Sequence, residues 1–252
     1  VFLYTSGSWP LALIVLVEDL ISFKRASSPL YQYLQDVPGM FDAGVSGLYQ
    51  KSESGLLSMA FHPLYAQNGY FFVFYSLSRN VGTASAPNWR LFQRISRFRA
   101  SGNAPYTAAT TADPTSEVPL ISQWDEIANH NGGDMAFGPD GYLYIALGDE
   151  GNFFGSFANG IYINRDFFSA ILRIDVDQRA GNLPPNPHSQ PIAGALQNPF
   201  PSAVHAGTYR IPAGSDANPF IGMTQWHGQP IAPETVRTEF FAAGMRNPYR
   251  MS

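Results

Sequence analysis

The sequence predicts an all-β fold built from a repeated unit of four strands. Met59-Ala60-Phe61 returns as Met135-Ala136-Phe137, and Ile95-Ser96-Arg97-Phe98 returns as Ile171-Leu172-Arg173-Ile174, both 76 positions later. Two matches at one offset indicate an internal repeat. After each Phe-x-Pro the chain turns and gives an aromatic run, at 69–75 and at 141–147. The composition agrees, because 14% aromatic residues with 23 Gly and 20 Pro are typical of short strands joined by turns.

Each repeat contains four segments with strand character. The first repeat has them at 56–62, 69–77, 92–99 and 117–121, and the second at 134–138, 141–148, 170–176 and 237–243. Four short antiparallel strands repeated radially around a channel form a β-propeller, in which each blade packs only on its neighbours. The segments Leu11–Glu18, Leu20–Arg25 and Tyr31–Gln35 are predicted to be outer strands of one more blade.

A long insertion interrupts the second repeat at residues 178–236, which are rich in Pro, Asn and Gly and have no sustained period. A loop of this length in a compact domain is usually a functional surface loop. Strands resume after it, and Arg250-Met251-Ser252 has the character of the start of a third Met-Ala-Phe-like strand. We therefore expect residues 1–252 to be the N-terminal part of a single propeller domain whose C-terminal blades are missing.

Composition excludes several classes of function. The formal charge of −4 comes without any basic run, so the electrostatic footprint of a nucleic-acid-binding protein is missing. The chain has no cysteine, which excludes disulfides and thiolate metal sites. The apolar run Leu11–Val17 is too short to span a bilayer and has no basic flank, so we predict a buried strand and no membrane span.

Repeat symmetry selects the candidate site. Ser54, His130 and Arg246 each stand five residues before the methionine that opens a repeat strand, and this position leads into the innermost strand of a blade. Equivalent positions on successive blades converge at the mouth of the central channel, where propeller active sites are built. His130 could take a hydroxyl proton as a general base, and the alternative is a hydrogen-bonded loop histidine.

Two further motifs contain charged side chains. Arg246-Asn247-Pro248 follows a turn glycine and is suited to holding a carboxylate or stabilising negative charge on oxygen, and the alternative is an Arg paired with a nearby carboxylate. Asp149–Asn152 is an acidic turn without the spacing of a calcium loop, so we predict a solvated turn. The other histidines show no metal-ligand spacing: His62, His188, His205 and His227.

Several segments together resemble the glucose/sorbosone dehydrogenase family of soluble quinoprotein sugar dehydrogenases: Gly55–Pro63, Asn129–Gly133, Phe137–Gly141, Ile171–Asp175, Ile211–Pro212, Asn218–Phe220 and Arg246–Pro248. The resemblance implies a six-bladed propeller that uses pyrroloquinoline quinone (PQQ) and calcium, with calcium ligands largely beyond residue 252. It also implies that His130 removes the C1 hydroxyl proton of an aldose while hydride passes to the quinone, and that Arg246 and Asn247 contact the quinone oxygens.

The chain departs from the family pattern at three positions. Asn129 replaces an Asp, and a neutral amide can orient an imidazole but cannot stabilise imidazolium as a carboxylate does. Glu53 stands where the glucose-oxidising members have a substrate-contacting Gln, and Tyr249 replaces another Gln. By the resemblance, Asn129 and Glu53 are the substrate-binding positions, whereas the identity of the sugar does not carry over.

The sequence therefore predicts a periplasmic or extracellular quinoprotein that oxidises an aldose and passes electrons to an acceptor such as a cytochrome or a quinone. The alternative is a non-catalytic propeller that binds a protein or glycan through its loops, as the related hedgehog-interacting proteins do. Retention of His130, Arg246 and Asn247 favours the enzyme, whereas loss of the Asp and the Gln favours the binding module. A hydrolytic propeller would need several metal-binding carboxylates, and the equivalent positions offer only Glu53.

Overall fold

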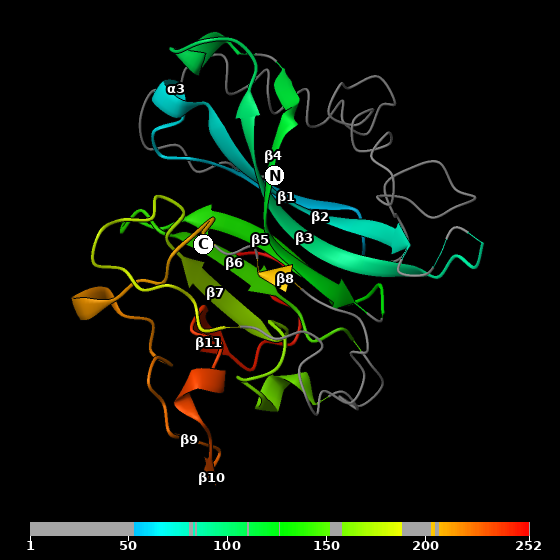
Figure 1. Ribbon diagram of the computed structural model, residues 1–252, viewed down its shortest axis with the longest axis vertical. Helices are drawn as coiled ribbons and strands as arrows, with labels where there is room; N and C mark the ends of the chain where they lie inside the picture. Colours follow the sequence, from blue (N-terminus) through cyan, green and yellow to red (C-terminus); the bar gives the residue numbers. More distant parts are fainter. Residues whose placement is uncertain are drawn as a thin grey trace.

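The fold consists mainly of two antiparallel sheets, which Figure 1 shows one below the other. This computed structural model describes residues 53–80, 83, 85–109, 111–125, 127–151, 158–187, 203–204 and 207–251. The strands predicted within residues 11–35 lie outside these ranges. None of the helices in the described ranges has the length and hydropathy that a bilayer span requires. The prediction of an antiparallel all-β fold is confirmed for the part of the chain that the structure describes.

The first sheet contains the four strands predicted for the first repeat, in the order in which they follow one another along the chain. These are β1 (Leu56–Phe61), β2 (Tyr70–Asn80), β3 (Trp89–Ala100) and β4 (Ala112–Asp125). The single-turn helix α3 (Tyr65–Asn68) joins β1 to β2, and a 3-10 turn at Tyr106–Ala108 precedes β4. Both faces of β2 are buried because its alternating side chains, such as Phe72 and Phe71, enter two different core clusters.

The second sheet contains the four strands predicted for the second repeat. These are β5 (Gly132–Phe137), β6 (Leu143–Leu147), β7 (Ala170–Ile174) and β11 (Phe240–Ala243), again paired in that order. A 3-10 turn at Asn159–Ile161 lies between β6 and β7. Strand β11 begins three residues later than predicted. The residues before it pack into the interior instead, where the Glu239 carbonyl accepts a hydrogen bond from the Arg173 N–H at 2.8 Å.

The two sheets meet along their first strands. Strands β1 and β5 are in contact, and one core cluster takes side chains from both sheets, including Phe74 and Ile145. His62, at the end of β1, also joins them, since its Nε2 lies 2.9 Å from Asp177 Oδ1 in the second repeat. Its Nδ1 accepts hydrogen bonds from the Leu64 N–H and the Asn68 amide, so the ring proton is on Nε2. His62 is therefore a structural residue, as the sequence suggested.

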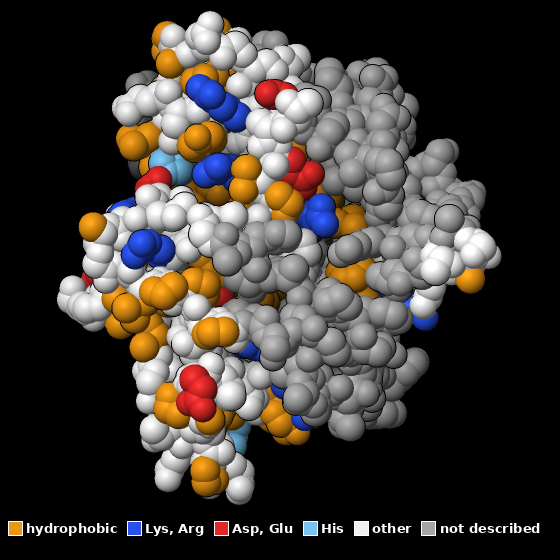
Figure 2. Space-filling model, viewed as in Figure 1, with side chains coloured by type: hydrophobic (Ala, Val, Ile, Leu, Met, Phe, Trp, Pro, Cys, Tyr) orange, Lys and Arg blue, Asp and Glu red, His pale blue; other side chains and the backbone are white. Residues whose placement is uncertain are grey.

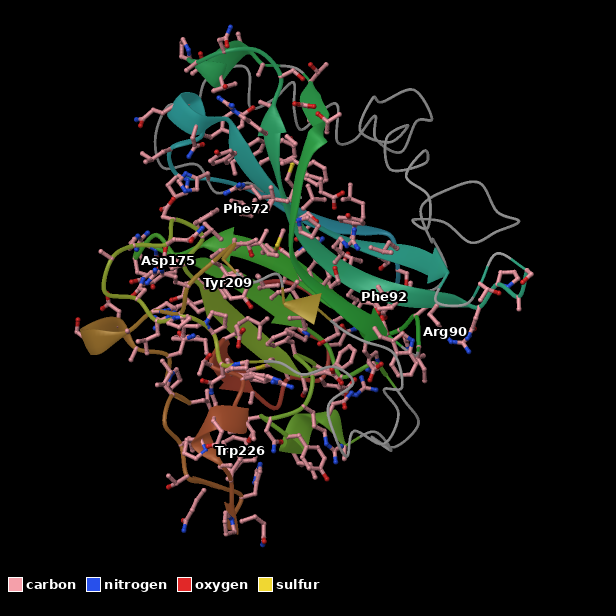
Figure 3. All side chains as sticks on the ribbon, viewed as in Figure 1. Phe72, Arg90, Phe92, Asp175, Tyr209 and Trp226 are labelled. Carbon is pink, nitrogen blue, oxygen red and sulfur yellow. The ribbon has the colours of Figure 1, made fainter. Side chains whose placement is uncertain are left out.

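The described parts of the insertion at 178–236 contain strands and buried residues. Its strand β8 (Ala203–Val204) pairs with β4 and gives the first sheet a fifth strand, which corrects the expectation of four. An unpaired edge of β4 offers N–H and C=O groups to such a strand. Tyr209 and Ile211 of the insertion are buried in the shared core, and Figure 3 shows Tyr209 near the centre of the molecule. Burial, with the nearby Glu239, raises the pKa of Tyr209 well above its usual value.

The rest of the insertion descends along the second sheet to the tip of the molecule. It contains 3-10 turns at Gly214–Asp216 and Pro233–Thr235. Between them is a hairpin of β9 (Gln225–Trp226) and β10 (Gln229–Pro230), which forms the lower tip in Figure 1. Trp226 holds the hairpin to the body, because its indole N–H donates to the Ile161 carbonyl at 2.9 Å.

Replacing Ile145 with Ala tests whether the two sheets share one core. Ile145 is fully buried in the cluster that both sheets line. We expect Ile145→Ala to lower the free energy of unfolding by about 2–5 kcal/mol and Ile145→Val by about 0.5–1.5 kcal/mol, because the first leaves the larger cavity. Urea unfolding measures both. A loss below about 1 kcal/mol for Ile145→Ala would contradict the shared core.

Candidate active site

The candidate residues lie next to the ends of strands. Glu53 precedes β1, His130 precedes β5, and Asn247 follows β11. The His130 N–H donates to Glu53 Oε2 at 2.8 Å, and Asn247 Nδ2 donates to the same oxygen at 3.0 Å. Asn247 Oδ1 in turn accepts from the Gly132 N–H at 3.0 Å. The structure thus brings together three of the residues that the sequence selected.

These contacts follow the repeat. Residues 77 apart bond in two places, the His130 N–H to Glu53 and the Asn131 amide to Ser54 Oγ, the latter at 3.0 Å. The segment that leads into β5 is therefore fixed by the corresponding segment before β1 in the neighbouring repeat. Ser54 reaches the residue after His130 and not His130 itself.

His130 is held in an uncommon conformation with its ring against a carboxylate. Its φ of 50° is in the left-handed region, and the residue is only 8% exposed. Nδ1 lies 2.7 Å from Asp149 Oδ1, which also accepts the Gly151 N–H at 3.0 Å. A carboxylate accepts hydrogen bonds, so Nδ1 carries the proton and Nε2 has its lone pair. Among the described residues Nε2 has no hydrogen-bond partner, which leaves it available to accept a proton.

Asp149 is a residue of the candidate site that sequence reasoning missed. The prediction of a solvated turn at Asp149–Asn152 is wrong for Asp149, because its carboxylate binds the His130 ring, whereas Asn152 lies outside the described residues. The hairpin register could have revealed it: Gly132 pairs with Leu147, and extending this pairing by two residues sets Asp149 opposite His130. Asp149 therefore supplies the negative charge that Asn129 cannot.

Asn129 also lies beside the imidazole. A β-carbon on Gly151 would stand 2.8 Å from both Asn129 Nδ2 and His130 Cγ. The turn after Asp149 therefore approaches Asn129 and His130 closely, and Gly151 permits this both by its missing β-carbon and by its φ of +62°. The Asn129 side chain is partly exposed, so it can reach a ligand at the imidazole.

Arg246 places an exposed cation on the same rim. Its carbonyl accepts the Asp149 N–H at 2.9 Å, so its backbone is fixed directly beside the His130 partner. The residue is exposed, and within the described ranges its guanidinium makes no ion pair or hydrogen bond. The alternative of an Arg paired with a neighbouring carboxylate therefore finds no support in the described part of the chain. A free guanidinium is suited to binding anionic oxygen atoms.

A calcium site is not formed by the part of the chain that the structure describes. No group of three or more His, Asp or Glu side chains is arranged there to hold a metal ion. Glu150 follows Asp149 but is 5% exposed, and its Oε2 accepts the Asn159 amide at 2.8 Å. On the face of the molecule that Figure 2 shows, the visible charged side chains are scattered and do not form a patch of one sign.

Comparison with known proteins gives a consistent family. The family model described as Glucose / Sorbosone dehydrogenase matches residues 22–188. Hedgehog-interacting protein from Mus musculus and from Homo sapiens are each 32% identical over 166 residues, covering 65% of this chain and 22% of the relative. The HIPL1 protein of Arabidopsis thaliana is 26% identical over 249 residues, covering 86% of this chain and 32% of the relative. The chain thus spans between about a fifth and a third of these relatives.

Two solved structures are similar over part of the chain. A glucose dehydrogenase aligns over 81% of this chain and 42% of its own, with 17% identity and a TM-score of 0.46. The PQQ-bound form of an aldose sugar dehydrogenase from Streptomyces coelicolor aligns over 56% of this chain and 39% of its own, with 23% identity and a TM-score of 0.36.

A pair of substitutions at Glu53 tests its contacts with His130 and Asn247. One oxygen accepts both hydrogen bonds, so Glu53→Gln can keep them through its amide oxygen, whereas Glu53→Ala removes both. We expect hydrogen exchange of the His130 amide to be unchanged in Glu53→Gln and to be about tenfold faster or more in Glu53→Ala. Equal exchange in the two variants would show that Glu53 does not hold His130.

Proposed function

The chain belongs to the glucose/sorbosone dehydrogenase family, and we propose that it acts as a PQQ-dependent dehydrogenase that oxidises the C1 hydroxyl of an aldose. The observation that carries this proposal is the His130–Asp149 pair, at 2.7 Å, on the rim formed by the strand ends. The proposed architecture is a six-bladed propeller in which the two sheets are neighbouring blades. An oriented histidine can act as a base, and an exposed arginine nearby can stabilise negative charge on oxygen, which are two of the roles that a catalytic site needs.

The proton-accepting group is His130 Nε2. Asp149 fixes the proton on Nδ1 and therefore directs the lone pair of Nε2 away from the turn. When Nε2 takes the sugar hydroxyl proton, the ring becomes imidazolium, and the Asp149 carboxylate stabilises that charge. The His130–Asp149 pair can thus stabilise an imidazolium, which the neutral side chain of Asn129 cannot do alone.

The rim residues suit the cofactor that the family implies. PQQ carries carboxylates and an ortho-quinone, and when bound it supplies the acceptor for the hydride that leaves C1. The exposed guanidinium of Arg246 is free to bind anionic oxygen. Asn247 uses its Oδ1 and one Nδ2 proton within the chain, so its second Nδ2 proton remains for the cofactor. The described residues would therefore hold only the quinone end, and calcium belongs to the proposal without assigned ligands.

Substrate contacts are proposed for Glu53 and Asn129. Glu53 is exposed, and while Oε2 holds His130 and Asn247, its Oε1 has no partner among the described residues. A free carboxylate oxygen accepts sugar hydroxyl groups well. The electrons would pass to a cytochrome or a quinone, and the compartment would be the periplasm or the extracellular space.

A second candidate function is recognition of a protein or glycan without catalysis. It is favoured by the names of the two relatives that are 32% identical, which are hedgehog-interacting proteins. It is also favoured by the Asn247 amide, which is largely engaged within the chain. The His130–Asp149 pair favours the enzyme, because a binding module has no need of an oriented base beside an unpaired arginine.

Activity of the full-length protein tests the choice. Reconstituted with PQQ and calcium, it should reduce an artificial acceptor when aldoses are present. His130→Ala should lower turnover by about two orders of magnitude or more, the scale of losing a general base, while PQQ stays bound. His227→Asn, in the exposed β9–β10 hairpin, is the control and should keep full activity. Full activity in His130→Ala would exclude it as the base, and a wild type that binds no PQQ would favour the binding module.

Two further substitutions separate cofactor binding from proton transfer. Asp149→Asn can keep a hydrogen bond to His130 but loses the charge, so turnover should fall by about tenfold or more at unchanged PQQ affinity. Arg246→Ala removes a cation from the proposed quinone contacts, so both PQQ affinity and turnover should fall. Titration of PQQ absorbance measures the affinity. The assignments would be wrong if Asp149→Asn lost the cofactor and Arg246→Ala retained it.

A further inference from the structure

The loop that carries His130 is closed by a buried amide from a different strand. Asp125 ends β4 at one side of the loop, and Asn131 precedes β5 at the other side. Gln93, in the middle of β3, donates from Nε2 to Asp125 Oδ2 at 2.9 Å and to Asn131 Oδ1 at 3.2 Å. All three side chains are essentially inaccessible to solvent, at 0–1% exposure. A single NH₂ group therefore holds both ends of the loop.

The chemistry of these groups fixes the orientation of the Gln93 amide. The Asp125 carboxylate only accepts hydrogen bonds, so the NH₂ group must face it, and a flipped amide would set oxygen against oxygen. Asp125 also shapes the start of the loop, because its Oδ1 accepts the Ile127 N–H at 3.2 Å. At the other end, Asn131 Nδ2 donates to Ser54 Oγ at 3.0 Å. The network thus runs from the first sheet to the residue beside His130.

We propose that Gln93 and Asp125 are positioning residues for His130, an inference that rests on the proposed role of His130 as the base. His130 has a φ of 50°, which a residue with a β-carbon keeps only when its surroundings determine it. In that conformation Nδ1 lies 2.7 Å from Asp149 Oδ1, a contact that joins the loop before β5 to the turn after β6. Fixing both loop ends keeps the chain in it. Neither residue touches the proposed reacting atoms.

Gln123 offers a matched control within the same sheet. It pairs directly with Gln93 across the β3–β4 ladder and is equally buried, at 0% exposure. Its Oε1 accepts the Phe167 N–H at 2.5 Å, so it holds a different segment of the chain. A loss caused merely by removing a buried amide should therefore be the same at both positions. A loss caused by misplacing His130 should occur at Gln93 alone.

The experiment compares Gln93→Met with Gln123→Met in the full-length protein, using amide hydrogen exchange and steady-state kinetics with PQQ, calcium and an aldose. Both variants should lose thermal stability. In Gln93→Met alone, we expect exchange at His130 to be about tenfold faster or more, and kcat to fall about 10- to 100-fold at an unchanged KM, because the base is displaced. Asp125→Asn keeps one carbonyl oxygen and should show a smaller change in the same direction, which provides a test if Gln93→Met does not fold.

Three outcomes would overturn the proposal. The first is wild-type exchange at His130 in both Gln93→Met and Asp125→Asn, and the second is wild-type kcat in both. The third is an equal fall of kcat in Gln123→Met. A wild type that is inactive with PQQ removes the proposed function, and the exchange data then decide the positioning role of Gln93 by themselves. Faster exchange confined to the Gln93 and Asp125 variants would support it.

Discussion

The antiparallel pairing of β5 with β6 is the constraint on which the candidate site depends. Gly132 pairs with Leu147 at one end of this ladder. Beyond that end the two segments continue side by side, so that His130 faces Asp149. The approach is so close that a β-carbon on Gly148 would overlap the His130 carbonyl oxygen. Position 148, on the β6 side, must therefore be a glycine, because any side chain would collide with the backbone of His130. On the β5 side, His130 itself adopts a φ of 50°. The chemistry of the imidazole follows from this backbone geometry.

Neighbouring repeats stabilise that geometry from two directions. Glu53 of the first repeat accepts the His130 N–H at the exposed rim, and Gln93 of the same repeat holds both loop ends in the interior. Below the rim, residues such as Phe74 and Ile145 form one core that packs the two sheets against each other. The entrance to β5 is bonded in two places to the entrance to β1, which fixes the backbone at His130 and Asn131. Rigid placement of the base is what proton transfer requires.

The same rim is compatible with two functions, catalysis and binding, because one fold supports unrelated functions and the residues of the site decide between them. The replacement of Asp by Asn at position 129 removes a carboxylate beside His130, yet Asp149 provides one through the hairpin. Arg246 remains exposed and unpaired within the described ranges. These two features are the ones on which the proposed dehydrogenase activity rests. The internal hydrogen bonds of Asn247 are the feature that a binding protein would tolerate equally well.

The sequence by itself determined the eight strands of the two repeats, because the aromatic runs after turns and the 76-residue offset can be read directly from the order of the residues. It also selected His130 through repeat symmetry, and Glu53 and Asn247 through the family resemblance, and the structure brings these three together. Only the tertiary structure decided the pairing of β8 with β4, the partnership of Asp149 with the imidazole, and the role of Gln93. Each of these depends on which distant segments become neighbours, and hydrogen bonds between residues far apart in the chain leave no period in the sequence.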